Sequence, residues 1–111
     1  MLFRSDPERY AGKKVTVVGQ FRGRNLFGDL PTVSQRDPSD WVLKDGESAI
    51  WVTGKSPRGK GWALDPGYKA DTSRWLQVVG KAEVVDGIVY LRASDVALAA
   101  APKPLEADTT R

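Results

Sequence analysis

The stretch from Trp41 to Thr53 reads WVLKDGESAIWVT and decides the fold of this chain. Two runs rich in β-branched and aromatic residues flank Asp45-Gly46, a dipeptide that is typical of two-residue hairpin turns. Residues that lie opposite each other across such a turn share one face of the sheet. We therefore predict an antiparallel hairpin in which Lys44 pairs with Glu47 beside the turn.

Alternation along this hairpin separates two faces. One face is apolar and is predicted to belong to the core: Trp41, Leu43, Ile50 and Val52. The other face is mixed and is predicted to point outward: Val42, Lys44, Glu47, Ala49, Trp51 and Thr53. One apolar and one mixed face is the pattern of a sheet that buries a single side.

A second hairpin is predicted from Trp75 to Ala93, with its turn at Asp86-Gly87. The turn position pairs Val84 with Val89 and Ala82 with Leu91, which places these four side chains in the core with Leu76 and Val78. The outward positions on the same strands are Trp75, Gln77, Lys81, Glu83, Tyr90 and Arg92. We expect the last strand to continue through Val96 and Leu98.

The remaining segments are predicted from the alternation of apolar residues and from the Gly and Pro residues that interrupt regular structure. Apolar alternation from Lys13 to Arg22 predicts a long first strand, and Gly19 in its middle predicts a bulge or a sharp bend. Residues 25–40 and 54–74 are rich in Gly, Pro, Asp and Ser and are predicted to be loops, with a short helix near Tyr68 to Ser73. A helical turn is expected over residues 5–12, and residues 99–111 form a tail or linker after a single domain at 1–98.

These segments amount to one long strand followed by two hairpins. Five half-buried strands are too few for a sandwich and suit a small closed barrel, so the predicted class is all-β. Three stretches carry a resemblance to the OB-fold, specifically to the anticodon-binding-like families: Tyr10 to Gly19, Trp41 to Thr53, and Trp75 to Lys81 leading into Ile88 to Leu91. The resemblance covers about residues 8–98 and implies a five-stranded Greek-key barrel. It also implies binding of single strands or oligosaccharides on the outer face of the second and third strands.

Composition excludes several kinds of site. The chain has 111 residues with neither Cys nor His, so disulfides, thiolate chemistry and histidine catalysis are excluded. We expect a non-catalytic protein with no metal and no cofactor. The chain has no apolar run of about 20 residues that could span a membrane. The lack of cysteine suits the cytoplasm, although the sequence leaves localisation and oligomeric state open.

Seventeen basic and fourteen acidic residues give a net charge of +3, which is compatible with a polyanion partner. A base needs a flat aromatic surface for stacking, and its phosphate needs cations. On the outer face Trp51 supplies an aromatic stacking surface. Nearby Lys and Arg residues supply the cations, and an aromatic residue in the 25–40 loop adds a second ring. The predicted ligand-binding residues are Arg22, Arg24, Phe27, Lys44, Trp51, Lys55, Arg58 and Lys60. Weak, sequence-tolerant binding of single-stranded nucleic acid is the leading hypothesis.

Two alternatives stay open at this point. Trp51 could instead pack beneath the 54–74 segment, and the chain would then be a protein-interaction or spacer domain of a larger protein without a nucleic-acid ligand. An oligosaccharide or a peptide on the same face is a further hypothesis. Trp62, in the Gly-rich stretch KGWALDPG, is predicted to plug the open end of the barrel.

Overall fold

A computed structural model describes residues 12–31, 34–46 and 48–100. The helical turn expected at residues 5–12 falls almost wholly outside this part of the chain, as does the tail. The described elements are the strands β1 (Lys14–Phe21), β2 (Trp41–Asp45), β3 (Ser48–Thr53), β4 (Arg58–Gly59), β5 (Trp62–Ala63), β6 (Trp75–Val85) and β7 (Ile88–Ala99), and the 3₁₀ helix η2 (Lys69–Ser73). No described helix is long and apolar enough to cross a membrane.

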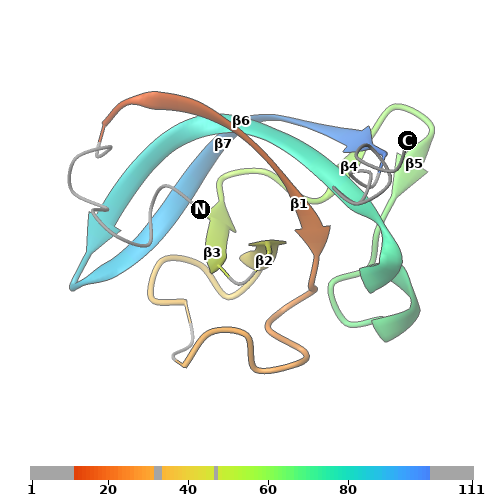
Figure 1. The fold of residues 1–111 in the computed structure, drawn as a ribbon, viewed down its shortest axis with the longest axis horizontal. Coiled ribbons are helices and arrows are strands. Elements are labelled where there is room, and N and C mark those ends of the chain that lie inside the picture. Colours follow the sequence, from red (N-terminus) through yellow and green to blue (C-terminus); the bar gives the residue numbers. More distant parts are fainter. Residues whose placement is uncertain (1–11, 32–33, 47, 101–111) are drawn as a thin grey trace, which may run out of the picture.

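Five of the strands close a barrel in the order β1-β2-β3-β7-β6. Every neighbouring pair is antiparallel except β3 and β7, which run parallel. The predicted all-β, OB-like five-stranded barrel is therefore confirmed. Figure 1 shows the long β6–β7 hairpin arching over one side of the barrel, while the connection from β1 to β2 crosses the opposite side. The small β4–β5 hairpin lies beside the end of β7.

The first hairpin has the predicted faces but a different register. Leu43 pairs with Ile50 and Asp45 with Ser48, so Asp45 belongs to β2 and only Gly46 of the predicted turn lies beyond the strand. The predicted partner of Lys44 was Glu47, whereas Lys44 pairs with Ala49. This error of two residues leaves both faces unchanged, because side chains alternate with a period of two.

The second hairpin has the predicted register, with Val84 opposite Val89 and Ala82 opposite Leu91. Asp86 and Gly87 both have positive φ, at 51° and 78°, as a type I′ turn requires. β7 continues to Ala99, as the apolar pattern predicted. The register of this pair shifts between Val79 and Gly80, which is the site of a bulge.

The interior of the barrel holds the main core. Its buried members are Val17, Phe21, Trp41, Leu43, Ile50, Val52, Leu64, Leu76, Val78, Ala82, Leu91 and Ala93. Trp62 packs against this cluster and is half-buried, which agrees with its predicted role as a plug. At Gly19 the pairing of β1 shows no bulge. Gly19 is needed there because it has no side chain: an added Cβ would lie 2.8 Å from the Cγ of Leu43.

A second apolar cluster lies on the outer face of β2, β3 and β7. Val42, Trp51 and Tyr90 are its buried members, at 0%, 4% and 0% exposure. Leu30, from the connection between β1 and β2, packs against them. The same connection donates the Gln35 N–H to the hydroxyl of Tyr90 over 2.7 Å. The β1–β2 connection therefore covers the outer face that the sequence predicted to be open.

Candidate functional site

Phe27, in the described part of the β1–β2 connection, is an exposed aromatic side chain with two cations beside its ring. Its side chain is 46% exposed. The guanidinium carbon of Arg22 lies 4.2 Å from the centroid of its ring, and the ammonium of Lys69 lies 5.5 Å from the same centroid. Both distances are within the range of cation–π attraction. We call Phe27, Arg22, Lys69, Lys44 and Asp29 the Phe27 surface.

Asp29 fixes the cations of this surface. Its carboxylate, 8% exposed, accepts a hydrogen bond from Nε of Arg22 at 2.7 Å and one from Nζ of Lys44 at 3.2 Å. Burial of the Asp29 carboxyl raises its pKa, but the two hydrogen bonds and the two positive charges outweigh burial and hold the pKa below its usual value. The guanidinium of Arg22 is thereby held over the ring of Phe27.

Two residues shape the connection that carries Phe27. Asn25 adopts the left-handed conformation, with φ at 62°, which Asn tolerates better than most residues. Gly23 also has positive φ, at 66°, and an added Cβ there would lie 2.5 Å from the carbonyl oxygen of Pro66. The N–H of Arg24 donates to that same carbonyl over 2.9 Å. These contacts join the start of the connection to the segment that precedes η2, from which Lys69 comes.

Trp51 does not provide the stacking surface that the sequence predicted. With 4% exposure it offers no ring face to a base, because the β1–β2 connection packs over it. The alternative, in which the 54–74 segment covers Trp51, also differs from the structure. The side chain that packs over the outer cluster from a loop is Leu30, which belongs to the β1–β2 connection. Tyr90, likewise predicted to point outward, is buried beneath the same connection.

The other predicted site residues lie in three separate places. Arg22, Phe27 and Lys44 come together on the Phe27 surface. Arg24 is exposed and lines a separate hollow described below. Lys55, Arg58 and Lys60 are exposed and belong to the β3–β6 connection, where β4 and β5 lie on the other side of the barrel from the β1–β2 connection (Figure 1). Among the described residues, none of these three cations makes a cation–π contact with Phe27.

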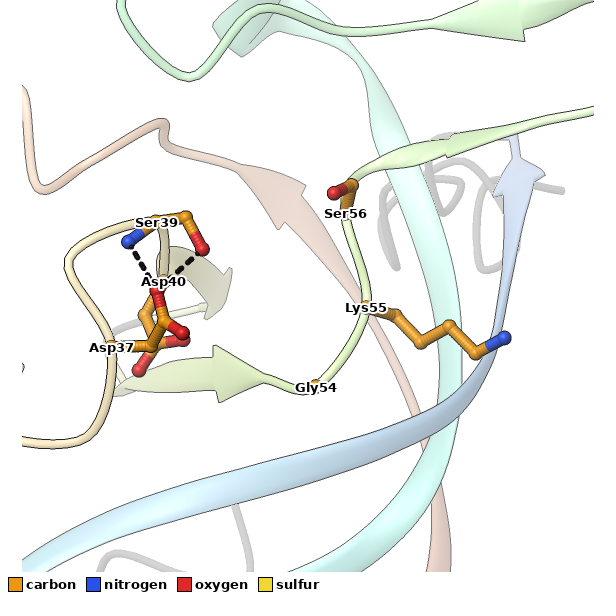
Figure 2. Close-up of a pocket in the computed structure, with 6 residues that line it drawn as sticks. All are labelled: Asp37, Ser39, Asp40, Gly54, Lys55 and Ser56. Atoms are coloured by element: carbon orange, nitrogen blue, oxygen red, sulfur yellow. Dashed lines mark hydrogen bonds between the residues drawn. The ribbon is translucent and has the colours of Figure 1, made fainter.

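A hollow of about 370 Å³ lies beside Trp51. Its lining is Arg24, Ser34, Asp37, Pro38, Asp40 and Trp51, and we call it the Trp51 hollow. A smaller hollow of about 160 Å³ shares Asp37 and Asp40. Figure 2 shows both aspartates on one loop, facing the Gly54–Ser56 segment, while the side chain of Lys55 points away from them.

Three further cations form a row across the outer face of three strands. Lys14 pairs with Lys81 across β1 and β6, and Lys81 pairs with Arg92 across β6 and β7. All three residues are exposed and line a hollow of about 420 Å³. Arg92 donates to the carboxylate of Glu83 at 2.8 Å, so one of the three charges is compensated.

No protein-family model matches this sequence, and no curated protein matches it. Among solved structures, the hypothetical protein YgiW from E. coli has a similar fold, with a TM-score of 0.54 at 17% sequence identity. The likeness covers 80% of this chain and 77% of that chain. At this level of identity the likeness concerns the fold alone.

Sequence reasoning missed two members of the Phe27 surface. Lys69 stands in a loop-like stretch with no pattern, and only the packing of η2 against β1 brings it to Phe27. Asp29 was read as part of a loop rather than as an ion-pair partner. Asp29 follows Arg22 by only seven residues, a separation at which an ion pair is possible. The sequence does not determine the path of the chain between the two residues, however, so it does not predict this pair.

Proposed function

We propose that this chain is a non-catalytic binding module whose ligand is single-stranded nucleic acid, held weakly and with little sequence preference at the Phe27 surface. The observation that carries the proposal is the half-exposed ring of Phe27 with the cations of Arg22 and Lys69 beside it. A base would stack on this ring, and the neighbouring cations would follow the phosphates.

The energetics suit a weak binder. Stacking of one base on an aromatic side chain is worth about 1–3 kcal/mol. The ion pairs with Asp29 hold Arg22 and Lys44 in place, which reduces the side-chain entropy that binding would otherwise cost. Because Asp29 compensates part of their charge, Lys69 supplies the least compensated cation of this surface.

The place of Phe27 in the fold also supports the proposal. The connection between the first two strands of an OB-like barrel commonly contributes to oligonucleotide binding. In this chain that connection covers the outer face of β2 and β3, and it presents Phe27 on its own exposed side. The proposed ligand surface is therefore the connection itself rather than the strands beneath it.

The experiment is a titration of fluorescently labelled oligothymidine, followed by anisotropy at ~20 mM and ~200 mM salt. The variants are Phe27→Ala and Lys69→Gln, with Lys81→Gln as a control that removes the same charge from the distant basic row. We expect Phe27→Ala to weaken binding by about 5- to 150-fold, the equivalent of one lost stack. Lys69→Gln should weaken binding and reduce the salt slope by about one.

Two outcomes would contradict the proposal. Equal losses in Lys69→Gln and Lys81→Gln, with no loss in Phe27→Ala, would mean general attraction to a positively charged protein. Absence of binding at low salt, where counterion release is most favourable, would remove the nucleic-acid ligand and leave a protein-interaction module as the function to test.

A further inference from the structure

The basic row, which consists of Lys14, Lys81 and Arg92, lies on three adjacent strands of the barrel. β1, β6 and β7 are neighbours in the sheet (Figure 1). Lys14 pairs with Lys81, and Lys81 pairs with Arg92, so the three side chains share one face. Like charges directly opposite each other destabilise a sheet. The fold therefore holds this row at a cost in stability, which a bound anion would remove.

Glu83 compensates only part of the charge of the row. Its Oε2 accepts a hydrogen bond from Nε of Arg92 at 2.8 Å, and its Oε1 lies 3.2 Å from Nη1 of Arg36. One carboxylate is thus shared between two guanidinium groups. Neither Lys14 nor Lys81 forms an ion pair with another described residue. Three positive charges and the one negative charge of Glu83 leave a net charge of +2.

A β-bulge shapes the hollow beside the row. The pairing of β6 with β7 shifts between Val79 and Gly80, and Ser94 is the extra residue on β7 at this shift. Gly80, Ala93 and Ser94 line the same hollow of about 420 Å³ as the three cations. Bulges often lie next to binding sites, and a glycine in a strand permits close approach of a ligand to the backbone. The small side chains at the bulge therefore leave room for a ligand beside the cations.

Ser94 adds a hydroxyl group to the lining. This residue is exposed, and its hydroxyl donates to the carbonyl of Val79 at 3.1 Å. The distance is long for an O–H···O bond, whose usual value is about 2.7–2.8 Å. The hydroxyl can therefore turn toward an acceptor in the hollow at little cost. Two ammonium groups, one guanidinium group and one hydroxyl group then face a ligand from three strands.

From this lining we infer that the hollow binds the phosphate group of a small organic phosphomonoester. Such a group carries a charge of about −1.5 to −2 at pH 7 and has three oxygens that accept strong hydrogen bonds. Both properties complement the net charge of the row and its set of donors. A phosphodiester carries only one negative charge. The volume lies in the lower part of the range for small-molecule pockets, which leaves space for an organic group beside the phosphate.

This site differs from the Phe27 surface in its place and in its ligand. The ring of Phe27 has Arg22 and Lys69 beside it, neither of which lines the hollow. The function proposed for the Phe27 surface requires stacking of a base, whereas the described lining of the hollow contains no aromatic side chain. Each of the two proposals can therefore fail without the other.

The test is a ¹⁵N NMR titration of the full chain at ~20 mM salt with ribose 5-phosphate, inorganic phosphate and dimethyl phosphate. We expect ribose 5-phosphate to shift the amide resonances of Gly80 and Ser94 saturably, with about millimolar affinity, because exposed ion pairs are individually weak. Inorganic phosphate should bind no more tightly than ribose 5-phosphate. Dimethyl phosphate, a diester with one charge, should bind at least about threefold more weakly.

The pH dependence isolates the charge of the ligand. The charged side chains at the hollow are the basic row, Glu83 and Asp95, and the chain has neither Cys nor His. No side-chain type in this chain has an ordinary pKa between about 5 and about 7.5. The second pKa of a phosphomonoester is about 6. Affinity for ribose 5-phosphate should therefore fall by about threefold or more between about pH 7.5 and about pH 5.

The variants Lys14→Gln and Lys81→Gln each remove one charge from the row, with Lys60→Gln as a control in an exposed turn. Each of the first two should weaken ribose 5-phosphate binding by about 2- to 5-fold, the equivalent of one exposed ion pair, and the control should leave it unchanged.

Four outcomes would overturn the inference. Equal losses in all three variants would mean general attraction to a positively charged protein. Dimethyl phosphate binding as tightly as ribose 5-phosphate would remove the role of the second charge, and tighter binding of inorganic phosphate would remove the organic group. Absence of a saturable shift at Gly80 and Ser94 in the unmodified protein would overturn it however the variants behave.

Discussion

The side-chain amide of Asn25 exchanges two hydrogen bonds with the backbone of Leu30. Nδ2 of Asn25 donates to the carbonyl of Leu30 at 2.8 Å, and the N–H of Leu30 donates to Oδ1 at 2.9 Å. Leu30 packs against the outer cluster of Val42, Trp51 and Tyr90. One amide therefore holds the side chain that closes the outer face of the barrel, and Phe27 lies within the loop that it braces.

Replacement of Asn25 by Ala should destabilise the fold through two separate effects. The two hydrogen bonds contribute about 0.5–1.5 kcal/mol each, and Ala in the left-handed conformation costs about 1–2 kcal/mol. We expect a loss of about 2–5 kcal/mol in the free energy of unfolding, measured by urea denaturation. Asn25→Gly lacks the second effect and should lose about 1 kcal/mol less. Equal losses in both variants would show that the conformation of residue 25 contributes nothing.

The low pKa of Asp29 makes part of the stability depend on pH. A carboxyl whose pKa is lower in the folded state than in the unfolded chain stabilises the fold above the unfolded value of about 3.9. That stabilisation is lost as pH falls below this value and through the folded pKa. We expect Asp29→Asn to reduce the free energy of unfolding by about 1–3 kcal/mol at pH 7.

The same variant should differ less from the unmodified protein as pH falls below about 3.9 and through the lower folded pKa of Asp29, because protonation of the carboxyl then removes its ion pairs. Urea denaturation at several pH values measures this difference. A gap between the two proteins that stays constant over this range would contradict the role given to the ionised carboxylate.

Gly80 should not tolerate a side chain. An added Cβ would lie 2.2 Å from the carbonyl oxygen of Arg92, at the bulge where β6 and β7 change register. Because this neighbour is backbone, Gly80→Ala should cost more than about 3 kcal/mol or prevent folding. Gly12→Ala is the control, since Gly12 has open space around it and should cost only the ~1–2 kcal/mol of a left-handed Ala. Thermal unfolding followed by circular dichroism distinguishes the two.

Lys81 lies between Lys14 and Arg92 in the basic row, and like charges directly opposite each other on a sheet repel. Lys81→Gln should therefore stabilise the protein by about 0.2–1 kcal/mol at low salt. The gain should shrink above ~0.5 M salt because of screening. Lys60→Gln removes an equal charge from an exposed turn and should show no comparable gain.

The sequence predicted which face of the sheet each side chain lies on better than it predicted which residues are in contact. Trp41 and Leu43 were placed in the core correctly, because a period of two fixes the face even when the register is wrong by two residues. The register of the second hairpin was also correct, because Asp86 and Gly87 both adopt the positive φ that their turn requires. In the first hairpin Asp45 stays in the strand, and local turn preference did not reveal this.

The candidate site was less predictable than the fold. Trp51 does point outward from the barrel, but the sequence could not show that the β1–β2 connection folds back over it. That path depends on contacts between distant residues, such as Gln35 with Tyr90, and on the bracing of Leu30 by Asn25. The sequence assigned Arg22 and Phe27 to one site around Trp51; the structure brings these two side chains together away from Trp51, where only a short loop separates them.

The parallel pairing of β3 with β7 has a consequence for how the barrel folds. The β6–β7 hairpin is local and can form within about 1–10 μs, as isolated hairpins do. Contact of Trp51 with Tyr90 and pairing of β1 with β6 join segments far apart in the sequence, and each requires closure of a long loop. Barrel closure should therefore limit the folding rate to the millisecond-to-second range of β barrels with many non-local contacts. Until closure occurs, β3 presents one unpaired edge, at which a second chain could add in place of β7.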